Sequence, residues 1–256
     1  MAGAYPRLVA CDDAGMVWVW IGVFAVVAIA SAAQALSGFG FALIATPIVA
    51  VLAGPREAVV GLTMVGLLLV AQLSLRGRGH VDRPTVLVMT VAAILGMPLG
   101  LLVLAQVEER VLTLLIAAAV ILFAVLLWRG LRLPRHRGTD AVAGFAAGIL
   151  STSTGTSGPP IVIALSAKEM QPRVFRATIS VIFLVQGSAA LVAFALGDQV
   201  TMDALAVALA GLPGLVLGSI FGERGFRRLD VSTFRAVVLG MLFASGVVAL
   251  LGAVLG

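Results

Sequence analysis

Apolar residues fill the chain in long, almost unbroken runs, and the short breaks between these runs carry most of the charged residues. Six runs are close to the roughly 20 residues that an α-helix needs to cross the hydrocarbon core of a bilayer. The pattern predicts an all-α, polytopic integral membrane protein. The six runs are residues 58–75, 86–105, 111–128, 174–196, 204–221 and 231–255.

Two other runs, residues 16–53 and 141–167, do not fit a single span. The first is too long, and a Ser-Gly-Phe-Gly sequence at 37–40 interrupts it. The second is interrupted at 151–160 by hydroxyl residues, glycines and two prolines, with too few apolar residues on either side to cross. Non-helical backbone at membrane depth is tolerated only where it is buried in protein or lines a water-filled cavity. We therefore expect both runs to be broken, re-entrant segments.

The two halves of the chain carry similar motifs in the same order, which indicates an internal duplication of the kind common in transporters. The matching stretches are 39–49 with 153–162, 55–56 with 172–173, 72–74 with 186–188, and 96–98 with 211–213. The predicted organisation is an N-terminal tail (1–15), a first transmembrane repeat (16–130), a basic cytoplasmic linker (131–140) and a second transmembrane repeat (141–256).

The positions of positive charge favour one arrangement of these repeats. If every run crossed the membrane, lysine and arginine would divide almost evenly between the two sides. If the broken segments return to their own side, thirteen of the seventeen collect together, in the loops at 76–83, 129–137, 168–176 and 224–228. Cytoplasmic loops carry such an excess. We expect inverted repeats, each with a broken opening segment and three transmembrane helices. The first run also has room for a full span plus a short re-entrant piece, which would put the N-terminus inside, so the side of the N-terminus stays open.

Composition supports a membrane protein and argues against several other classes. The chain is 61% hydrophobic and 11% charged, whereas soluble domains carry about 25% charged residues. Its arginines lie in short loops rather than in a stripe, so we expect no nucleic-acid partner. Cys11 is alone, and His80 and His136 lie in separate loops, so we expect no metal or other cofactor. Asp12 and Asp13 precede the first run, where a cleaved signal peptide has basic residues. We expect a multi-pass protein of a bacterial inner membrane, with its oligomeric state open.

The two breaks are the first candidates for a binding site. Half-helices that meet at mid-membrane direct backbone N–H groups and positive dipole ends at one place, which suits an anion. The other interpretation is that glycine and serine only let helices pack closely. The candidate substrate-binding residues are Ser37, Gly38, Phe39 and Gly40 in the first break, and Ser153, Thr154, Gly155, Thr156, Ser157, Gly158 and Pro159 in the second.

Three further polar residues belong to the predicted site. Gln72 and Gln186 lie inside spans at equivalent repeat positions, where an amide contacts substrate or bonds a neighbouring helix. Arg176 begins a span on the predicted cytoplasmic side, either as an orientation-setting side chain or as a gate that attracts anions. No Asp, Glu, Lys or His lies in the middle of an apolar run, so we see no coupling residue. No nucleophile and base lie together at depth, so we expect no enzyme.

With these motifs, the chain resembles the sulfite exporter TauE/SafE family, also called the toluene sulfonate uptake permease family, from about Gly22 to Gly252. The resemblance implies a secondary transporter or facilitator that exports small anionic sulfur compounds such as sulfite, sulfoacetate or other organosulfonates. A non-transporting assembly or scaffold protein of the membrane is the alternative. The motifs that carry the resemblance are Pro47 after the first break, Gly158-Pro159-Pro160, Phe175-Arg176-Ala177-Thr178 and Pro213-Gly214-x-x-x-Gly218.

Overall fold

The structure is a computed structural model that describes residues 13–77, 79–129, 134, 136–225 and 247. Within these ranges the regular structure is entirely α-helical, so the all-α prediction is confirmed. The helices are α1 (Asp13–Ser37), α2 (Phe41–Ala53), α3 (Pro55–Gly77), α4 (Arg83–Gln106), α5 (Glu109–Trp128), α6 (Arg137–Ser153), α7 (Gly158–Ser166), α8 (Pro172–Leu196) and α9 (Met202–Gly225).

Six of the described helices are long and apolar enough to cross a membrane, namely α1, α3, α4, α5, α8 and α9. Five of them coincide with spans predicted from the sequence. The sixth predicted span, 231–255, lies outside the described residues except for position 247. The structure adds α1 instead, whose apolar part covers Val17–Ala35. Helices α2 and α7 are too short to cross, with 13 and 9 residues.

Both opening segments are broken within the predicted stretches. The first break spans residues 38–40, where Gly38 and Gly40 have φ angles of 84° and 108°. These left-handed conformations suit glycine, which has no Cβ to clash with the backbone. The second break spans residues 154–157 and contains Gly155 at φ 69°. Helix α6 continues to Ser153, into the predicted break, and the hydroxyls of Thr152 and Ser153 bond to carbonyls one turn back in the helix.

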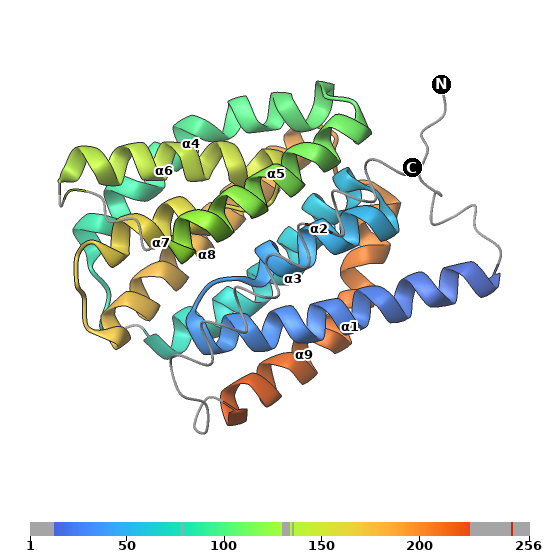
Figure 1. Ribbon diagram of the computed structural model, residues 1–256, viewed down its shortest axis with the longest axis horizontal. Helices are drawn as coiled ribbons and strands as arrows, with labels where there is room; N and C mark the ends of the chain where they lie inside the picture. Colours follow the sequence, from blue (N-terminus) through green and yellow to red (C-terminus); the bar gives the residue numbers. More distant parts are fainter. Residues whose placement is uncertain (1–12, 78, 130–133, 135, 226–246, 248–256) are drawn as a thin grey trace.

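Each pair of broken helices forms a hairpin whose legs lie side by side. A Cβ built on Gly22 of α1 would lie 3.1 Å from the Leu52 side chain near the end of α2. Asp140 at the start of α6 lies 2.6 Å from Lys168, just after α7. In Figure 1 the α1–α2 hairpin begins and ends toward the right and the α6–α7 hairpin begins and ends toward the left.

The long leg of each hairpin packs along a helix from the other half of the chain, α1 on α9 and α6 on α4. Glycines make this close approach possible, because an added Cβ at any of them would meet a backbone atom of the facing helix. They are Gly96 and Gly100 in α4, Gly144 and Gly148 in α6, and Gly214, Gly218 and Gly222 in α9. Helices α3 and α8 pack against each other as well.

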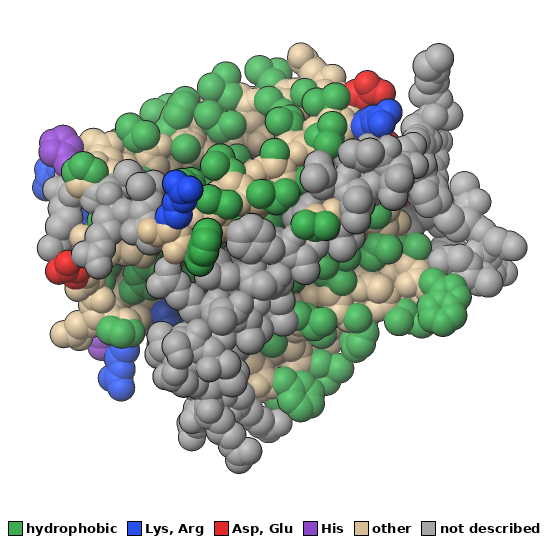
Figure 2. All heavy atoms as spheres, viewed as in Figure 1, with side chains coloured by type: hydrophobic (Ala, Val, Ile, Leu, Met, Phe, Trp, Pro, Cys, Tyr) green, Lys and Arg blue, Asp and Glu red, His purple; other side chains and the backbone are tan. Residues whose placement is uncertain are grey.

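The outer surface is largely apolar. Figure 2 shows hydrophobic side chains over the middle of the described surface, with most charged side chains toward the two ends of the long axis. Leu87, Leu95 and Leu209 are each more than 60% exposed. In water this would be an aggregation hazard, whereas in a bilayer the same side chains face lipid.

Candidate functional site

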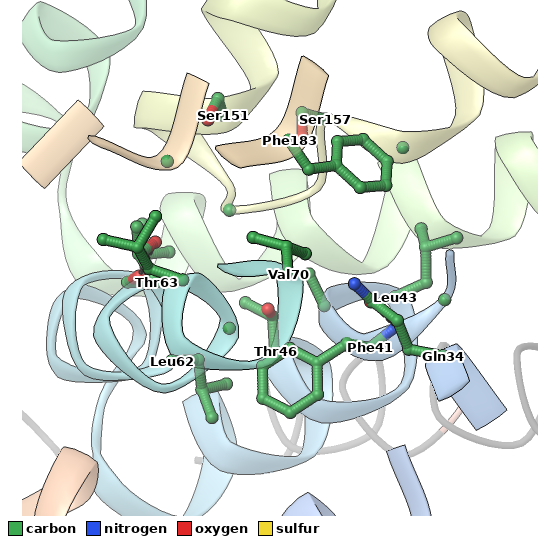
Figure 3. A pocket seen from close by; sticks show the side chains of 18 residues that line it. Gln34, Phe41, Leu43, Thr46, Leu62, Thr63, Val70, Ser151, Ser157 and Phe183 are labelled. Atoms are coloured by element: carbon green, nitrogen blue, oxygen red, sulfur yellow. Dashed lines mark hydrogen bonds between the residues drawn. The ribbon is translucent and has the colours of Figure 1, made fainter. Parts of the chain in front are cut away.

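A cavity of about 80 Å³ lies where the two breaks meet (Figure 3). A cavity needs about 10–15 Å³ by this measure to hold one water, so this one has room for several water-sized groups. Four elements line it. They are the first hairpin (Gln34, Gly40, Phe41, Ala42, Leu43, Thr46), α3 (Val59, Leu62, Thr63, Gly66, Leu67, Val70), the second hairpin (Ser151, Gly155, Ser157, Gly158) and α8 (Phe183, Gly187).

Four of the residues predicted for the site line this cavity: Gly40, Gly155, Ser157 and Gly158. The second break approaches the short helix of the first hairpin, since a Cβ built on Gly155 would lie 3.4 Å from the Thr46 hydroxyl of α2. The other predicted residues whose side chains are described do not line it.

Most hydroxyls of the second break bond within the protein. Thr152 Oγ1 donates to the carbonyl of Met97 at 2.8 Å. Ser153 Oγ donates to Ile149. Thr154 Oγ1 donates to the Leu150 carbonyl at 3.1 Å and lies 2.7 Å from Thr156 Oγ1. These hydroxyls hold the shape of the break, and Ser151 and Ser157 are the hydroxyl residues of this hairpin that line the cavity.

Four other predicted residues come from the ends of the two breaks, and those whose side chains are described do not line the cavity. Gly38 is buried, and its N–H donates to the carbonyl of Gln34 at 2.8 Å. Phe39 is partly buried and packs against both hydrophobic clusters of the core. Ser37 ends α1, and its side chain is outside the described part of the structure. Pro159 is buried in the first turn of α7, where proline fits a helix start.

The lining contains four polar residues that were not among the predicted site residues, namely Gln34, Thr46, Thr63 and Ser151. Gln34 and Thr46 are the most buried of them. Gln34 is 4% exposed, and its Oε1 accepts the N–H of Phe41 at 3.0 Å. This bond fixes the carboxamide so that its nitrogen points toward the cavity (Figure 3). Thr46 is 1% exposed, and among the described residues its hydroxyl has no hydrogen-bond partner. Both lie inside the first apolar run, and the reasoning applied to Gln72 would have identified Gln34.

Two helix N-termini open onto the cavity, one from each hairpin. Gly40 caps α2 and Ser157 caps α7, and neither cap makes a side-chain hydrogen bond. The first N–H groups of a helix have no partner within it. In α2 the Phe41 N–H donates to Gln34 Oε1, and the next N–H along the chain belongs to Ala42, which lines the cavity. In α7, Pro159 and Pro160 lack an N–H, so Gly158 supplies the N–H of the first turn.

The described lining holds no Asp, Glu, Lys, Arg or His. The positive ends of the two helix dipoles are therefore the main electrostatic features that the protein directs at the cavity. Such an environment can bind an oxyanion through N–H and O–H donors without a buried cation.

Arg176 contacts the first break from the side of α8. Its Nη2 donates to the carbonyl of Ala35 at 2.8 Å, in the last turn of α1. Its side chain also covers Gly38, since a Cβ built there would lie 3.5 Å from the arginine Cγ. Cations near a helix C-terminus are favourable, because unpaired carbonyls and the negative dipole end lie there. Arg176 therefore holds the end of α1 in place and is not part of the cavity lining.

The two predicted glutamines also lie away from the cavity lining. Gln186 is 1% exposed, and neither of its amide atoms has a hydrogen-bond partner within the described residues. Gln72 is half-buried in α3. The two glutamines therefore differ in burial although they occupy equivalent positions in the sequence repeats.

A polar cluster closes the base of the second hairpin. Lys168 Nζ donates to Asp140 Oδ2 and to Thr85 Oγ1, both at 2.6 Å. Thr85 in turn donates to Asp82, whose N–H donates to Thr178 Oγ1 at 3.0 Å. The cluster joins α4, α6 and α8. No group of three or more His, Cys, Asp or Glu that could hold a metal ion is present in the described ranges.

Comparison with known proteins agrees with this architecture. The chain is 25% identical over 232 residues to a protein of Cupriavidus necator named "Probable sulfite/organosulfonate exporter TauE", covering 86% of this chain and 90% of that protein. No solved structure matches the chain significantly. The family model described as "Sulfite exporter TauE/SafE" matches residues 23–249. The chain therefore belongs to the sulfite exporter TauE/SafE family of multi-pass membrane transporters, which are not enzymes.

Proposed function

We propose that this transporter exports small sulfur-containing anions, sulfite or organosulfonates, through the cavity between the two breaks. The observation that carries the proposal is the meeting of two helix N-termini and two buried polar side chains, Gln34 and Thr46, at one uncharged cavity. The printed name of the relative from Cupriavidus necator supports this substrate class and the direction of export.

The bound oxyanion would accept hydrogen bonds from both halves of the chain. Gln34 Nε2, Thr46 Oγ1 and the Ala42 N–H lie on the first hairpin, and Ser157 and the Gly158 N–H lie on the second. A hydrogen bond to a charged group contributes about 1.5–3 kcal/mol. Several such bonds offset the cost of removing a small anion from water, which no single unpaired donor could do.

We further propose that the two hairpins belong to inverted repeats, entering the membrane from opposite sides. Equivalent contacts support this arrangement. A Cβ built on Gly38 would lie 3.7 Å from the Cα of Arg176, near the start of α8. A Cβ built on Gly155 would lie 3.7 Å from the Cα of Val59, near the start of α3. Each break thus packs on the opening turns of the helix that follows the other hairpin.

Inverted repeats place the site midway between two similar half-structures, so that rocking one half against the other exposes it to alternate sides. In this arrangement the start of α1 lies on the same side as Gly54, opposite the basic loops, because α1 and α2 form one hairpin (Figure 1). Helix α1 extends beyond the end of α2, because Gly22, and not the first residue of α1, lies beside Leu52.

Purified protein in proteoliposomes loaded with radiolabelled sulfite or methanesulfonate tests the proposal. We expect protein-dependent release, which Ser157→Ala and Thr46→Val each slow by about tenfold, from the loss of one bond to a charged group. Thr90→Val is a matched control, because its hydroxyl bonds Val86 in α4 away from the cavity. Release equal to that of loaded liposomes without protein would instead favour a non-transporting scaffold protein.

A further inference from the structure

The charges around the cavity are few enough to limit the charge of the substrate. The side chains lining it are all uncharged. What remains is the N-terminus of α2 and the N-terminus of α7, each equivalent to about half a positive charge. Together they amount to about one elementary charge. This inference rests on the proposed function of the same site.

The polar side chains supply donors but no further positive charge. The oxygen of Gln34 is committed to the N–H of Phe41, so the carboxamide presents N–H groups to the cavity. The hydroxyl of Thr46 is buried, faces the cavity and has no partner among the described residues. It is therefore a donor for which a ligand oxygen is the available acceptor. A ligand rich in acceptors fits this site, and an ammonium group does not.

The walls beside these donors are apolar. Figure 3 shows Phe183 and Phe41 on the two sides of the cavity, with Val70 between them. Leu67 also lines it. A second negative charge would meet these side chains without a counter-charge, and burying an unpaired charge in such surroundings is strongly unfavourable. An apolar substituent on the ligand, in contrast, finds contacts there.

We propose that the site selects oxyanions that carry a single negative charge, with room for a small apolar substituent, and discriminates against dianions of the same oxygen geometry. Methanesulfonate and hydrogensulfite satisfy this description, whereas sulfate and fully ionised sulfite do not. This selection by charge follows from the two helix N-termini and the uncharged side chains that line the cavity, and it does not require a basic residue there.

Binding of methanesulfonate, sulfate and sulfite to the purified full-length protein tests the inference, measured by calorimetry or ligand-induced thermal stabilisation. We expect methanesulfonate to bind at least tenfold more tightly than sulfate at the same ionic strength. The apparent affinity for sulfite should fall as the pH rises through neutrality, because hydrogensulfite loses its proton. Methanesulfonate does not titrate in this range and serves as the control for effects of pH on the protein itself.

The outcomes separate the two proposals. Sulfate that binds as tightly as methanesulfonate, or sulfite affinity that does not follow the hydrogensulfite fraction, would overturn the charge selection and leave the anion site standing. Absence of binding by all three anions would overturn the site as well. Ser157→Lys adds one positive charge at the cavity and should shift the preference toward sulfate by tenfold or more.

Discussion

Lys168 and Asp140 form an ion pair at 2.6 Å although 28 residues separate them in the sequence. The intervening residues make up α6, the second break and α7. The ion pair therefore brings the start and the end of this segment together at one place, as expected for a re-entrant hairpin. The distribution of positive charge along the sequence predicts that both ends of this segment face the same side of the membrane, and this stays a prediction.

The first prediction concerns this topology. Single cysteines introduced at His136, Glu169 and Asp198, in a Cys11→Ala background, should divide into two groups when labelled with a membrane-impermeant maleimide. His136→Cys and Glu169→Cys should react from the cytoplasmic side, and Asp198→Cys from the opposite side. Reporter fusions after Arg137 and Lys168 should both report the cytoplasm. Opposite accessibility of positions 136 and 169 would contradict the re-entrant hairpin.

The ion pair itself should be important for stability. Lys168→Met leaves Asp140, whose side chain is 6% exposed, as a buried charge without its partner. Breaking a buried pair in this way costs about 3–5 kcal/mol, and the lower end applies because Lys168 keeps 20% of its side chain exposed. Thermal unfolding in detergent would measure the loss. The double variant Lys168→Met/Asp140→Leu should recover much of it, and no recovery would show that the charges do not act as a pair.

Thr46 and Thr152 should respond in opposite ways to replacement by valine. Thr46→Val removes a buried hydroxyl with no described partner, so the ligand-free protein should be as stable as before or more stable. Ligand affinity should fall about tenfold or more. Thr152→Val removes a bond to the Met97 carbonyl and should cost about 1 kcal/mol of stability without changing affinity. Thermal unfolding with and without methanesulfonate measures both quantities, and equal effects of the two variants on affinity would refute the assignment.

Arg176→Gln should slow transport through the loss of a bond to the backbone rather than through the loss of charge. The bond to the Ala35 carbonyl holds the last turn of α1, from which Gln34 reaches the cavity. Arg173→Gln removes the same charge from the same helix end at an exposed position and is the matched control. Substrate affinity of Arg176→Gln should fall severalfold while that of Arg173→Gln stays unchanged. If both variants lose affinity equally, Arg176 acts by attracting anions.

The sequence predicted the breaks because their cause is local. Gly38, Gly40 and Gly155 adopt left-handed φ angles, and two consecutive prolines start α7 at Gly158. Helix-breaking residues within apolar runs show such points without knowledge of the neighbours. The direction in which each hairpin enters the membrane stays a prediction from the charge counts, because the positive-inside rule depends only on which loops share a side.

The orientation of individual side chains could not be predicted in this way. Serine and threonine in a helix bond to carbonyls of the preceding turn when no better acceptor is near. Ser153 and Thr154 do so, whereas Ser151, in the same helix, lines the cavity. Which of these neighbours faces the cavity depends on how α6 packs on α4, a contact between distant segments. The role of Thr46 has the same origin.

The exchange of long legs between the halves has a consequence for biosynthesis. Helix α1 is made first, but its glycine-lined partner surface is on α9, which begins at Met202. Through most of synthesis the face of α1 that later meets α9 therefore has lipid or an insertion factor as its neighbour, although α2 already packs on another face. The first half cannot reach its final packing before α9 is inserted. A chain truncated after Leu196 would contain every described helix of the first half but would lack α9, the helix on which α1 packs. Such a chain would be a substrate for the quality-control proteases of the membrane. Neither half can therefore be expected to persist without the other.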